Sequence, residues 1–358
     1  MATIGVIRWP AFYMSAGVIE NETNTIGPAE WQQYLPWYGV RTGASSVTCQ
    51  GTQATMDAEI EQAWRNGVDY FAYDYWSNAL FSAGNNAIGL HQASPNAALV
   101  PWCLCVVGAN NASGWSTTAD QIVTLMQDVN YKKIGTHPLI YIFGTDAFIA
   151  DAITAGTTAA AQITTLRDKA TTAGLADPYI AICNPGDGGS DAGASALGAN
   201  FLSQYNITTG GTGSALTQAQ KLTALQSLWA TQVAYATYNV IPCVGLTWDL
   251  RARVASQEWC TSPPSGYSCS ATDYYGTATA ANVAAHVQAA IDFIAANPVY
   301  CATQHLLICG WDEYTEDGGL GPHLGDGGMY LQALSKQLRR QRENPRTMRS
   351  RGLALVTR

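Results

Sequence analysis

Eight short apolar runs alternate with longer amphipathic segments along the chain, and this alternation most constrains the fold. Strands that alternate with helices are typical of a parallel β/α protein, because each helix carries the chain back across the sheet. Eight strand–helix units predict an α/β fold, a single (β/α)8 TIM barrel with loop insertions. The expected strands are 4–9, 68–73, 99–107, 138–143, 179–184, 200–205, 240–246 and 306–310, and the clearest helices 56–66, 118–129, 158–173, 216–238, 280–296 and 328–340.

The residues after the first strand help to choose between two α/β folds, and the fold then gives the domain boundaries. An open, doubly wound sheet is the alternative fold, and it usually carries a Gly-rich phosphate-binding turn after its first strand. Arg8-Trp9-Pro10 follows the first strand here and does not resemble that turn. We therefore assign residues 1–340 to one catalytic barrel and residues 341–358 to a basic, disordered tail. A long loop is expected after the first strand, and a long insertion at 250–280.

Charge is scarce and unevenly distributed. Asp, Glu, Lys and Arg make up 12% of the chain, against about 25% in typical domains. Residues 336–358 contain eight basic residues and one acid, which leaves 10 basic and 25 acidic residues before them. A body this acidic predicts no nucleic-acid partner, because a phosphate backbone is bound by Lys and Arg.

Composition also bears on where the protein works. No stretch approaches about 18 consecutive apolar residues, so no membrane span is expected. A surface covered by uncharged polar residues is typical of a secreted or periplasmic protein whose leader is absent from this chain; a cytoplasmic location is the alternative. Cys260 and Cys269 flank a Ser/Pro/Gly loop and could form a disulfide there. The cysteines expected as small core residues are Cys103, Cys105, Cys183, Cys243 and Cys309.

The last expected strand runs directly into a cluster of acids. Asp312, Glu313, Glu316 and Asp317 lie within six residues, and two aromatic residues are interleaved with them. A solvated acidic loop would explain the acids but not the aromatic residues. Because barrel enzymes carry their active sites where the strands end, we interpret this turn as one wall of an active site.

In a barrel, the residues that follow the other strands converge on the same face. They are mostly aromatic, acidic or amide-bearing, and Arg8 and Arg251 are their only cations. Aromatic faces stack on sugar rings while carboxylates and amides bind hydroxyls, so this rim predicts an oligo- or polysaccharide ligand. The predicted sugar-binding residues are Trp9, Tyr13, Asp74, Tyr75, Trp76, Tyr141, Asn184, Tyr205, Trp248, Asp249, Trp311 and Asp312.

Two of the acids have a spacing that suits glycoside cleavage, which needs one protonated and one ionised carboxyl group. Glu313 and Glu316 are three residues apart, so in a helical turn their Cβ atoms would lie about 5–6 Å apart. Carboxyl groups this close raise one another's pKa, which supplies an acid and a base. If one of them is merely solvated, Asp74 or Asp249 becomes the partner.

Other chemistries have less support in the sequence. A G-x-S-x-G nucleophile elbow is absent, and no Cys/His spacing suits zinc. The acidic turn could bind Ca²⁺, but it lacks the D-x-D-x-D-G pattern of a calcium loop. We therefore expect no metal and no other cofactor.

Three segments carry a resemblance to a known family. The first strand with its Trp-Pro, residues 67–76 (GVDYFAYDYW) and residues 310–316 (GWDEYTE) together resemble glycoside hydrolase family 99, the family 99-like polysaccharide-locus proteins and, more distantly, family 71. The resemblance covers strands one, two and eight well and most of 1–335 loosely. It implies a retaining hydrolase of α-linked mannans, with Glu313 as the base on the sugar's own 2-hydroxyl and Glu316 as the general acid. Asp312 replaces the family's usual Asn and Asp317 its usual Gly, which leaves the sugar and the 2-hydroxyl mechanism open.

The sequence thus predicts a glycoside hydrolase that cleaves α-glycosidic bonds in a polysaccharide through Glu313 and Glu316. A non-catalytic carbohydrate-binding protein on the same scaffold is one alternative. A polysaccharide lyase is another, but it would need a cationic subsite for uronic acids, and this rim offers only two cations.

Overall fold

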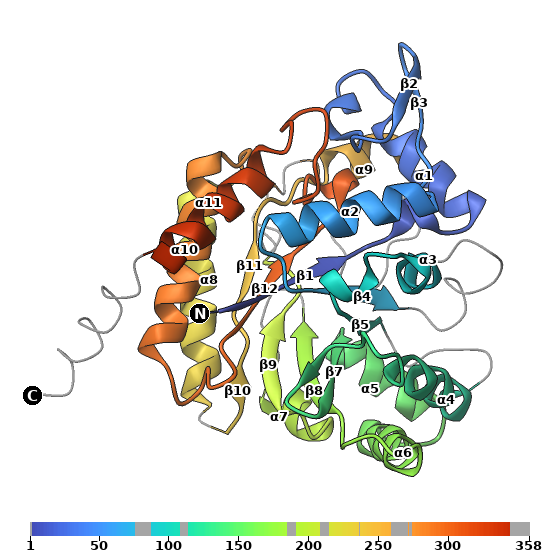
Figure 1. The fold of residues 1–358 in the computed structure, drawn as a ribbon, viewed down its shortest axis with the longest axis vertical. Helices are drawn as coiled ribbons and strands as arrows, with labels where there is room; N and C mark the ends of the chain where they lie inside the picture. Colours follow the sequence, from blue (N-terminus) through green and yellow to red (C-terminus); the bar gives the residue numbers. More distant parts are fainter. Residues whose placement is uncertain are drawn as a thin grey trace, which may run out of the picture.

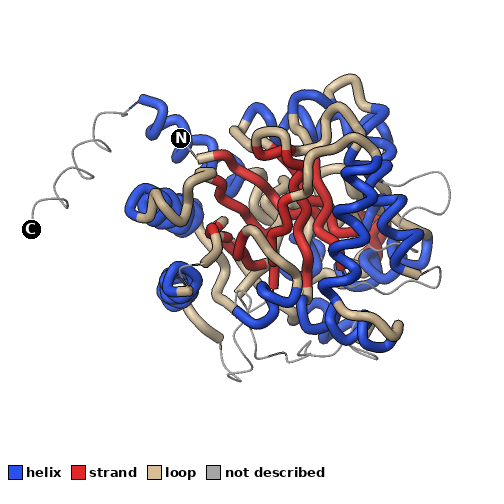
Figure 2. The backbone as a smooth tube through the Cα atoms, turned by 90° about the horizontal axis from the view of Figure 1, so that it is seen from below, coloured by secondary structure: helices blue, strands red, loops and turns tan. Residues whose placement is uncertain are grey.

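The computed structural model describes residues 2–75, 87–107, 114–184, 191–207, 215–235, 237–258, 271 and 274–343. Parallel strands form its centre, and helices surround them (Figures 1 and 2). The strands pair in the order β10-β9-β8-β7-β5-β4-β1-β12-β11, and a short strand, β6 (Lys133–Ile134), pairs antiparallel with β7. Their bounds are β1 Thr3–Arg8, β4 Tyr70–Tyr75, β5 Trp102–Val107, β7 His137–Phe143, β8 Tyr179–Asn184, β9 Phe201–Gln204, β10 Asn239–Val240, β11 Cys243–Gly245 and β12 His305–Cys309.

The two ends of this sheet are joined by one stretch of chain. β10 pairs with β9, whereas β11, which begins after two intervening residues, pairs with β12. Between them, Ile241 N–H donates to Leu202 O at 2.8 Å, and Pro242 O accepts from Leu307 N–H at 3.0 Å. Residues 239–245 therefore occupy one strand position that changes partner at Pro242, which has no N–H to donate. The predicted (β/α)8 barrel is confirmed, with its seventh strand divided in two.

Four of the helices begin where the sequence supplies hydroxyl caps. Thr52, Thr158, Thr217 and Thr279 each accept a hydrogen bond from the main chain of the first turn, which satisfies an otherwise unpaired N–H. The helices are α1 Ala16–Ile26, α2 Gln53–Arg65, α3 Ala87–Ala93, α4 Trp115–Met126, α5 Thr145–Thr154, α6 Ala159–Thr172, α7 Asp191–Ala196, α8 Gln218–Ala234, α9 Arg251–Ser256, α10 Ala280–Ala296 and α11 Met329–Glu343.

Side chains on the strands alternate between the barrel interior and the surrounding helices. Across the interior, Tyr70 Oη of β4 lies 2.7 Å from Tyr141 Oη of β7. The next residue on β4, Phe71, instead meets His91 of α3 edge to face. A Cβ atom on Gly5 of β1 would lie 2.1 Å from the Tyr70 ring, so only glycine leaves room for that tyrosine. The same alternation decides which residues at the strand ends face the site.

The barrel core also contains the free thiols that the sequence placed there. Cys103, Cys105, Cys183, Cys243 and Cys309 all lie on strands and are buried and unpaired by disulfides. Burial raises the pKa of the Cys103, Cys183 and Cys309 thiols well above the usual value. Their predicted role as small core residues is confirmed.

Two segments expected as loops contain helices that matter for the site. Between β1 and α2 the chain forms α1, short 3-10 turns and an exposed hairpin of β2 (Val40–Gly43) and β3 (Ser46–Thr48), which projects at the top of Figure 1. The expected insertion after β11 begins with α9. Cys260, Cys269 and residues 344–358 lie outside the described residues, so the disulfide and tail remain predictions.

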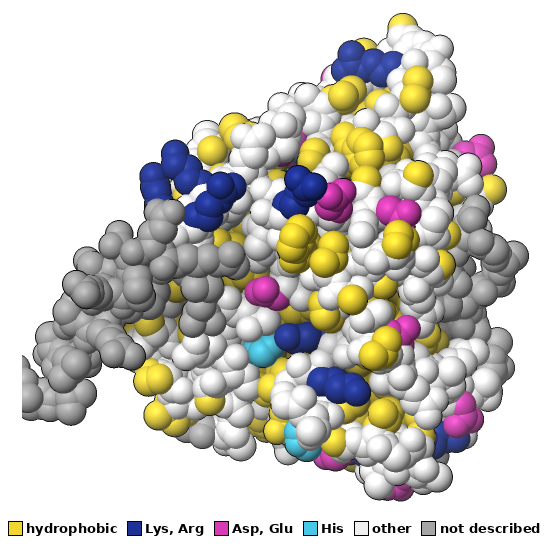
Figure 3. Space-filling model, in the orientation of Figure 1, with side chains coloured by type: hydrophobic (Ala, Val, Ile, Leu, Met, Phe, Trp, Pro, Cys, Tyr) yellow, Lys and Arg dark blue, Asp and Glu magenta, His cyan; other side chains and the backbone are white. Residues whose placement is uncertain are grey.

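The visible surface in Figure 3 is mostly uncharged polar or hydrophobic, with Lys, Arg, Asp and Glu scattered over it. This distribution matches the low charge content of the sequence. No helix among the described residues is long and apolar enough to cross a membrane.

Candidate functional site

The turn after β12 is fixed to two other strand ends by main-chain hydrogen bonds. Trp311 N–H donates to Ile7 O of β1 at 2.7 Å. On the other side, Asp249 N–H, four residues after β11, donates to Glu316 O at 2.7 Å. The segment Tyr314–Glu316 forms a 3-10 turn, η4. The acids of the turn are therefore held by neighbouring strands and not by a free loop.

The first acid of the turn joins a closed arginine cluster beneath α2, the Arg8 cluster. Arg8 Nε donates to Asp312 Oδ2 at 2.9 Å, and Arg8 Nη2 is paired with Glu59 of α2. Tyr13 Oη and Trp311 Nε1 also donate to Glu59, at 2.5 and 3.2 Å. All five side chains are at most 1% exposed, so this cluster is sealed from solvent.

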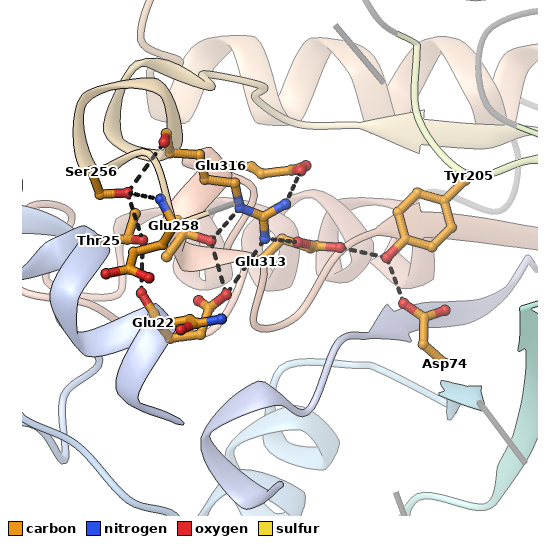
Figure 4. Close-up of polar contacts among 11 residues, drawn as sticks. Glu22, Thr25, Asp74, Tyr205, Ser256, Glu258, Glu313 and Glu316 are labelled. Carbon is orange, nitrogen blue, oxygen red and sulfur yellow. Dashed lines mark hydrogen bonds and ion pairs between the residues drawn. The ribbon is translucent and has the colours of Figure 1, made fainter. Parts of the chain in front are cut away.

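The next acids converge on a second guanidinium, that of Arg253 on α9, and form the Arg253 cluster. Arg253 Nη1 is paired with Glu316, and Nη2 lies 3.4 Å from Glu313 Oε2 and 3.6 Å from Glu22 Oε1 of α1. Arg253 Nε donates to Thr315 Oγ1 at 2.8 Å, and this hydroxyl donates to Glu22 at 3.3 Å. Figure 4 shows the three glutamates pointing toward this one cation. Two carboxyls of the E-x-x-E turn thus face one another across an arginine.

Glu313 has a second set of partners toward the barrel interior. Tyr205, just after β9, lies with its hydroxyl 2.5 Å from Glu313 Oε1 and 2.6 Å from Asp74 Oδ2 of β4 (Figure 4). Asp74 is 2% exposed and Glu313 6%. Asp74, Tyr205 and Glu313, predicted from three separate strands, are therefore brought together.

Burial and repulsion shape the proton affinity of these acids. The pKa of Glu313 rises to about 8, because burial and the neighbouring Glu316 both disfavour its charge, although Arg253 opposes them. Burial raises the pKa of Asp74 well above the usual range, and Glu313 adds to this effect. Burial likewise raises the pKa of Asp312 to about 8, against the attraction of Arg8. Carboxyl groups that keep protons near neutral pH are what acid–base catalysis requires.

Several predicted sugar-binding residues bond within the protein. Tyr75 Oη donates to Gln121 of α4 at 3.1 Å, on the outer side of the barrel, and Tyr141 pairs with Tyr70 inside it. Tyr13, Trp311 and Asp312 belong to the sealed Arg8 cluster. These five side chains bond to residues outside the Arg253 cluster, and their sugar contacts stay predictions.

Other predicted residues lie next to the acidic turn, where Asp249 N–H donates to Glu316 O. Asp249 forms a bidentate pair with Arg251, whose guanidinium stacks 3.9 Å from the centre of the Tyr274 ring and 5.8 Å from that of Trp31. Trp248 precedes Asp249 and is 5% exposed. Arg251 therefore links Asp249, beside the acidic turn, to two aromatic rings.

The remaining predicted residues are placed less fully. Trp9 directly follows β1 and is partly exposed. Asn184 ends β8, where its backbone lies in register with Gln204. Trp76 lies outside the described residues, so its sugar contact stays a prediction.

Sequence reasoning missed Glu22 and Arg253, which contact the acidic turn, and Glu59, which belongs to the Arg8 cluster. Glu22 and Arg253 come from the two segments expected as loops, where helices α1 and α9 carry them toward the turn. One signal was available: Arg251 and Arg253 are two of only 10 basic residues in the first 335. A pair of arginines there, in an acidic chain, indicates carboxylates to be neutralised nearby.

Within the described part of the chain, no group of three or more His, Cys, Asp or Glu side chains could hold a metal ion. The acids of the site are instead arranged around arginines and Tyr205.

Comparison with known proteins finds solved structures that share the fold of this chain. No protein-family model matches the sequence, and no curated protein matches it. Two solved structures of a GH99 endo-alpha-mannosidase from Bacteroides thetaiotaomicron, one in complex with bis-tris-propane, superpose with TM-scores of 0.59. Identity is 12% and 13%, and the match covers 97% of this chain and 98% of each of those. The predicted resemblance to family 99 is confirmed at the level of the fold.

Proposed function

We propose that this protein is a glycoside hydrolase that cleaves α-glycosidic bonds in an oligo- or polysaccharide, with Glu313 and Glu316 as its catalytic pair. The observation that carries the proposal is their placement: two carboxyls of one turn at the carboxyl end of β12 share the Arg253 guanidinium. The GH99 endo-alpha-mannosidase structures, which share the fold, support the reaction class.

The resemblance gives an order to the two roles, which we adopt. Glu313 acts as the base that takes a proton from a sugar hydroxyl, and Glu316 as the acid that protonates the leaving oxygen, with net retention. Arg253 contacts both carboxyls and Glu22, so it can compensate whichever of them is ionised as protons move. Tyr205 holds Glu313 from the other side.

The paired arginines favour a hydrolase over a lyase. A lyase acting on uronic acids needs a cation available to the substrate carboxylate. Among the described residues of the site, Arg8 is paired with Glu59 and Asp312, Arg251 with Asp249, and Arg253 with three glutamates. Their charges are already balanced by protein carboxylates, which suits a neutral glycan.

The test is product formation from a panel of α- and β-linked glycans. We expect new reducing ends from an α-linked glycan, and NMR of the first-formed product should show the anomer of the substrate. Glu313→Gln and Glu316→Gln should each lower kcat by at least about 100-fold while the circular dichroism spectrum is unchanged. Glu61→Gln, at an exposed surface pair with Arg65, is the matched control.

Each alternative has its own signature in the same assay. Near-normal turnover in both glutamine variants would overturn the assignment of the pair. Glycan binding without new reducing ends would identify a non-catalytic binding protein, and an unsaturated, ultraviolet-absorbing product would identify a lyase.

A further inference from the structure

The hydroxyl of Tyr205 occupies a position that demands one more proton than the phenol can supply. It lies 2.6 Å from Asp74 Oδ2 and 2.5 Å from Glu313 Oε1. Oxygen atoms this close repel one another unless a hydrogen lies between them. The phenol has one hydrogen, so it can donate to only one of the two carboxyls. The other carboxyl must be protonated and must donate to the phenol oxygen.

The surroundings decide which carboxyl carries that proton. Asp74 lies deeper, and the charged groups with the largest effect on it are Glu313 and Asp312, both acidic. Glu313 has a cation beside it, with Arg253 Nη2 at 3.4 Å from Oε2. A buried carboxylate without a cation is much costlier than one beside a guanidinium. The neutral form therefore belongs to Asp74.

We propose that Asp74 is held as a neutral carboxylic acid that donates its proton to Tyr205 Oη, so that Tyr205 directs its single hydroxyl proton at Glu313. The direction of the pKa shift agrees with this assignment, since burial raises the pKa of Asp74 well above the usual range. Asp74, predicted from the sequence as a sugar-binding residue, becomes a positioning residue that acts through Tyr205.

The consequence for catalysis rests on the proposed function. Tyr205 supports the ionised form of Glu313 at Oε1, and Arg253 supports it at Oε2. When Glu313 takes a proton from the sugar hydroxyl, that proton stays on its carboxyl group until it is returned. Asp74 keeps its own proton throughout. The charged and titratable groups that face Asp74 from the packed elements are Cys105, Tyr205, Cys309, Asp312 and Glu313. Those that face Glu313 are Glu22, Asp74, Tyr205, Arg253, Cys309 and Glu316.

The direct test needs no substrate. Carbon-13 NMR of protein labelled at the aspartate carboxyl carbon is recorded for the wild type and for Asp74→Asn between about pH 5 and about pH 8. We expect the resonance missing from Asp74→Asn to have the chemical shift of a protonated acid across that range. A carboxylate shift for that resonance near neutral pH would overturn the proposal, whether or not the protein cleaves glycans. Asp292→Asn, at an exposed position on α10, is the matched control for the spectra.

A second test uses the pH profile of kcat/KM. On its acidic limb, kcat/KM falls as the base Glu313 becomes protonated. Asn at position 74 is neutral and can still donate to Tyr205, so Asp74→Asn should keep the midpoint of this limb within about half a pH unit of the wild type. If Asp74 carried a charge, its removal would move that limb down by about one unit or more, which would overturn the proposal. Tyr205→Phe removes the bond to Glu313, and should move the limb upward and lower kcat/KM by about 10- to 100-fold.

Discussion

Two buried arginines lie on opposite sides of one short turn, and each neutralises acids that the turn supplies. The Arg8 cluster takes Asp312, together with Glu59 of α2. The Arg253 cluster takes the next acid, Glu313, together with Glu316 and Glu22. Consecutive residues thus enter two different environments.

The two clusters differ in the number of acids per arginine and in the exposure of their residues to solvent. In the Arg8 cluster two acids share one cation with the donors Tyr13 and Trp311, and every member is sealed in the core. The Arg253 cluster sets three acids against one cation, and Glu316 keeps 8% of its surface exposed. The fully closed cluster contributes to folding, whereas the larger excess of acids around Arg253 provides groups that exchange protons.

The largest expected effect on stability comes from breaking the Arg8 cluster. Arg8→Met leaves two buried acids without a cation, which should cost about 3–5 kcal/mol of unfolding free energy. Urea denaturation followed by tryptophan fluorescence measures this loss. Arg65→Met, which breaks the exposed pair with Glu61, should cost no more than about 1 kcal/mol. Equal losses in the two variants would show that the Arg8 cluster is not structural.

Breaking the other cluster should change pH dependence more than stability. Arg253→Met removes the cation that lowers the pKa of Glu313, so that pKa should rise further. A base must be ionised to act, so the acidic limb of kcat/KM should move up by about one pH unit or more. The control is Arg251→Met on the same helix, which pairs with Asp249 and should leave the limb in place. An unmoved limb in Arg253→Met would contradict the role of this cation.

A smaller effect should appear in how stability depends on pH. The pKa of Asp74 is raised in the folded protein, while in the unfolded chain it returns to about 3.9. The folded state therefore binds this proton more tightly, and stability from Asp74 falls as pH rises above about 4, by up to about 1.4 kcal/mol per pH unit. Asp74→Asn lacks this term, so its stability relative to the wild type should increase with pH in urea titrations. A constant difference between the two proteins would contradict the raised pKa.

The smallest effect on stability and turnover is expected from Asp312→Asn, although Asp312 directly precedes the proposed base Glu313. The amide oxygen can still accept from Arg8 Nε, so we expect a loss of about 1 kcal/mol and kcat within about tenfold of the wild type. Side-by-side unfolding and turnover measurements on Asp312→Asn and Glu313→Gln check this. A loss of turnover in Asp312→Asn as large as in Glu313→Gln would place Asp312 in the reaction.

Much of this arrangement follows from the sequence by simple rules. The alternation of strands and helices predicts the barrel, Thr279 predicts the start of α10, and the E-x-x-E turn predicts the paired acids. The division of the seventh strand at Pro242 follows from partners on both sides of the barrel, which no local pattern records.

The rim residues show where sequence reasoning stops. Asp74 and Tyr75 are neighbours on β4, yet one faces the site and the other faces α4, because successive side chains point to opposite faces of a strand. Treating every residue near a strand end as part of the rim ignored that alternation. Local sequence patterns could not predict the contacts of Glu22 and Arg253 with the turn, because these contacts arise only from tertiary packing.

The rate at which the thiols inside the barrel are alkylated reports how fast the barrel opens. Cys103, Cys183 and Cys309 have raised pKa values and are at most 1% exposed, so an alkylating reagent meets neither a thiolate nor a path to it while the ring is intact. Labelling then proceeds only as fast as the strands separate. Mass spectrometry of the labelled peptides would report whether the seam at Pro242, beside Cys243, opens before the opposite wall at Cys103.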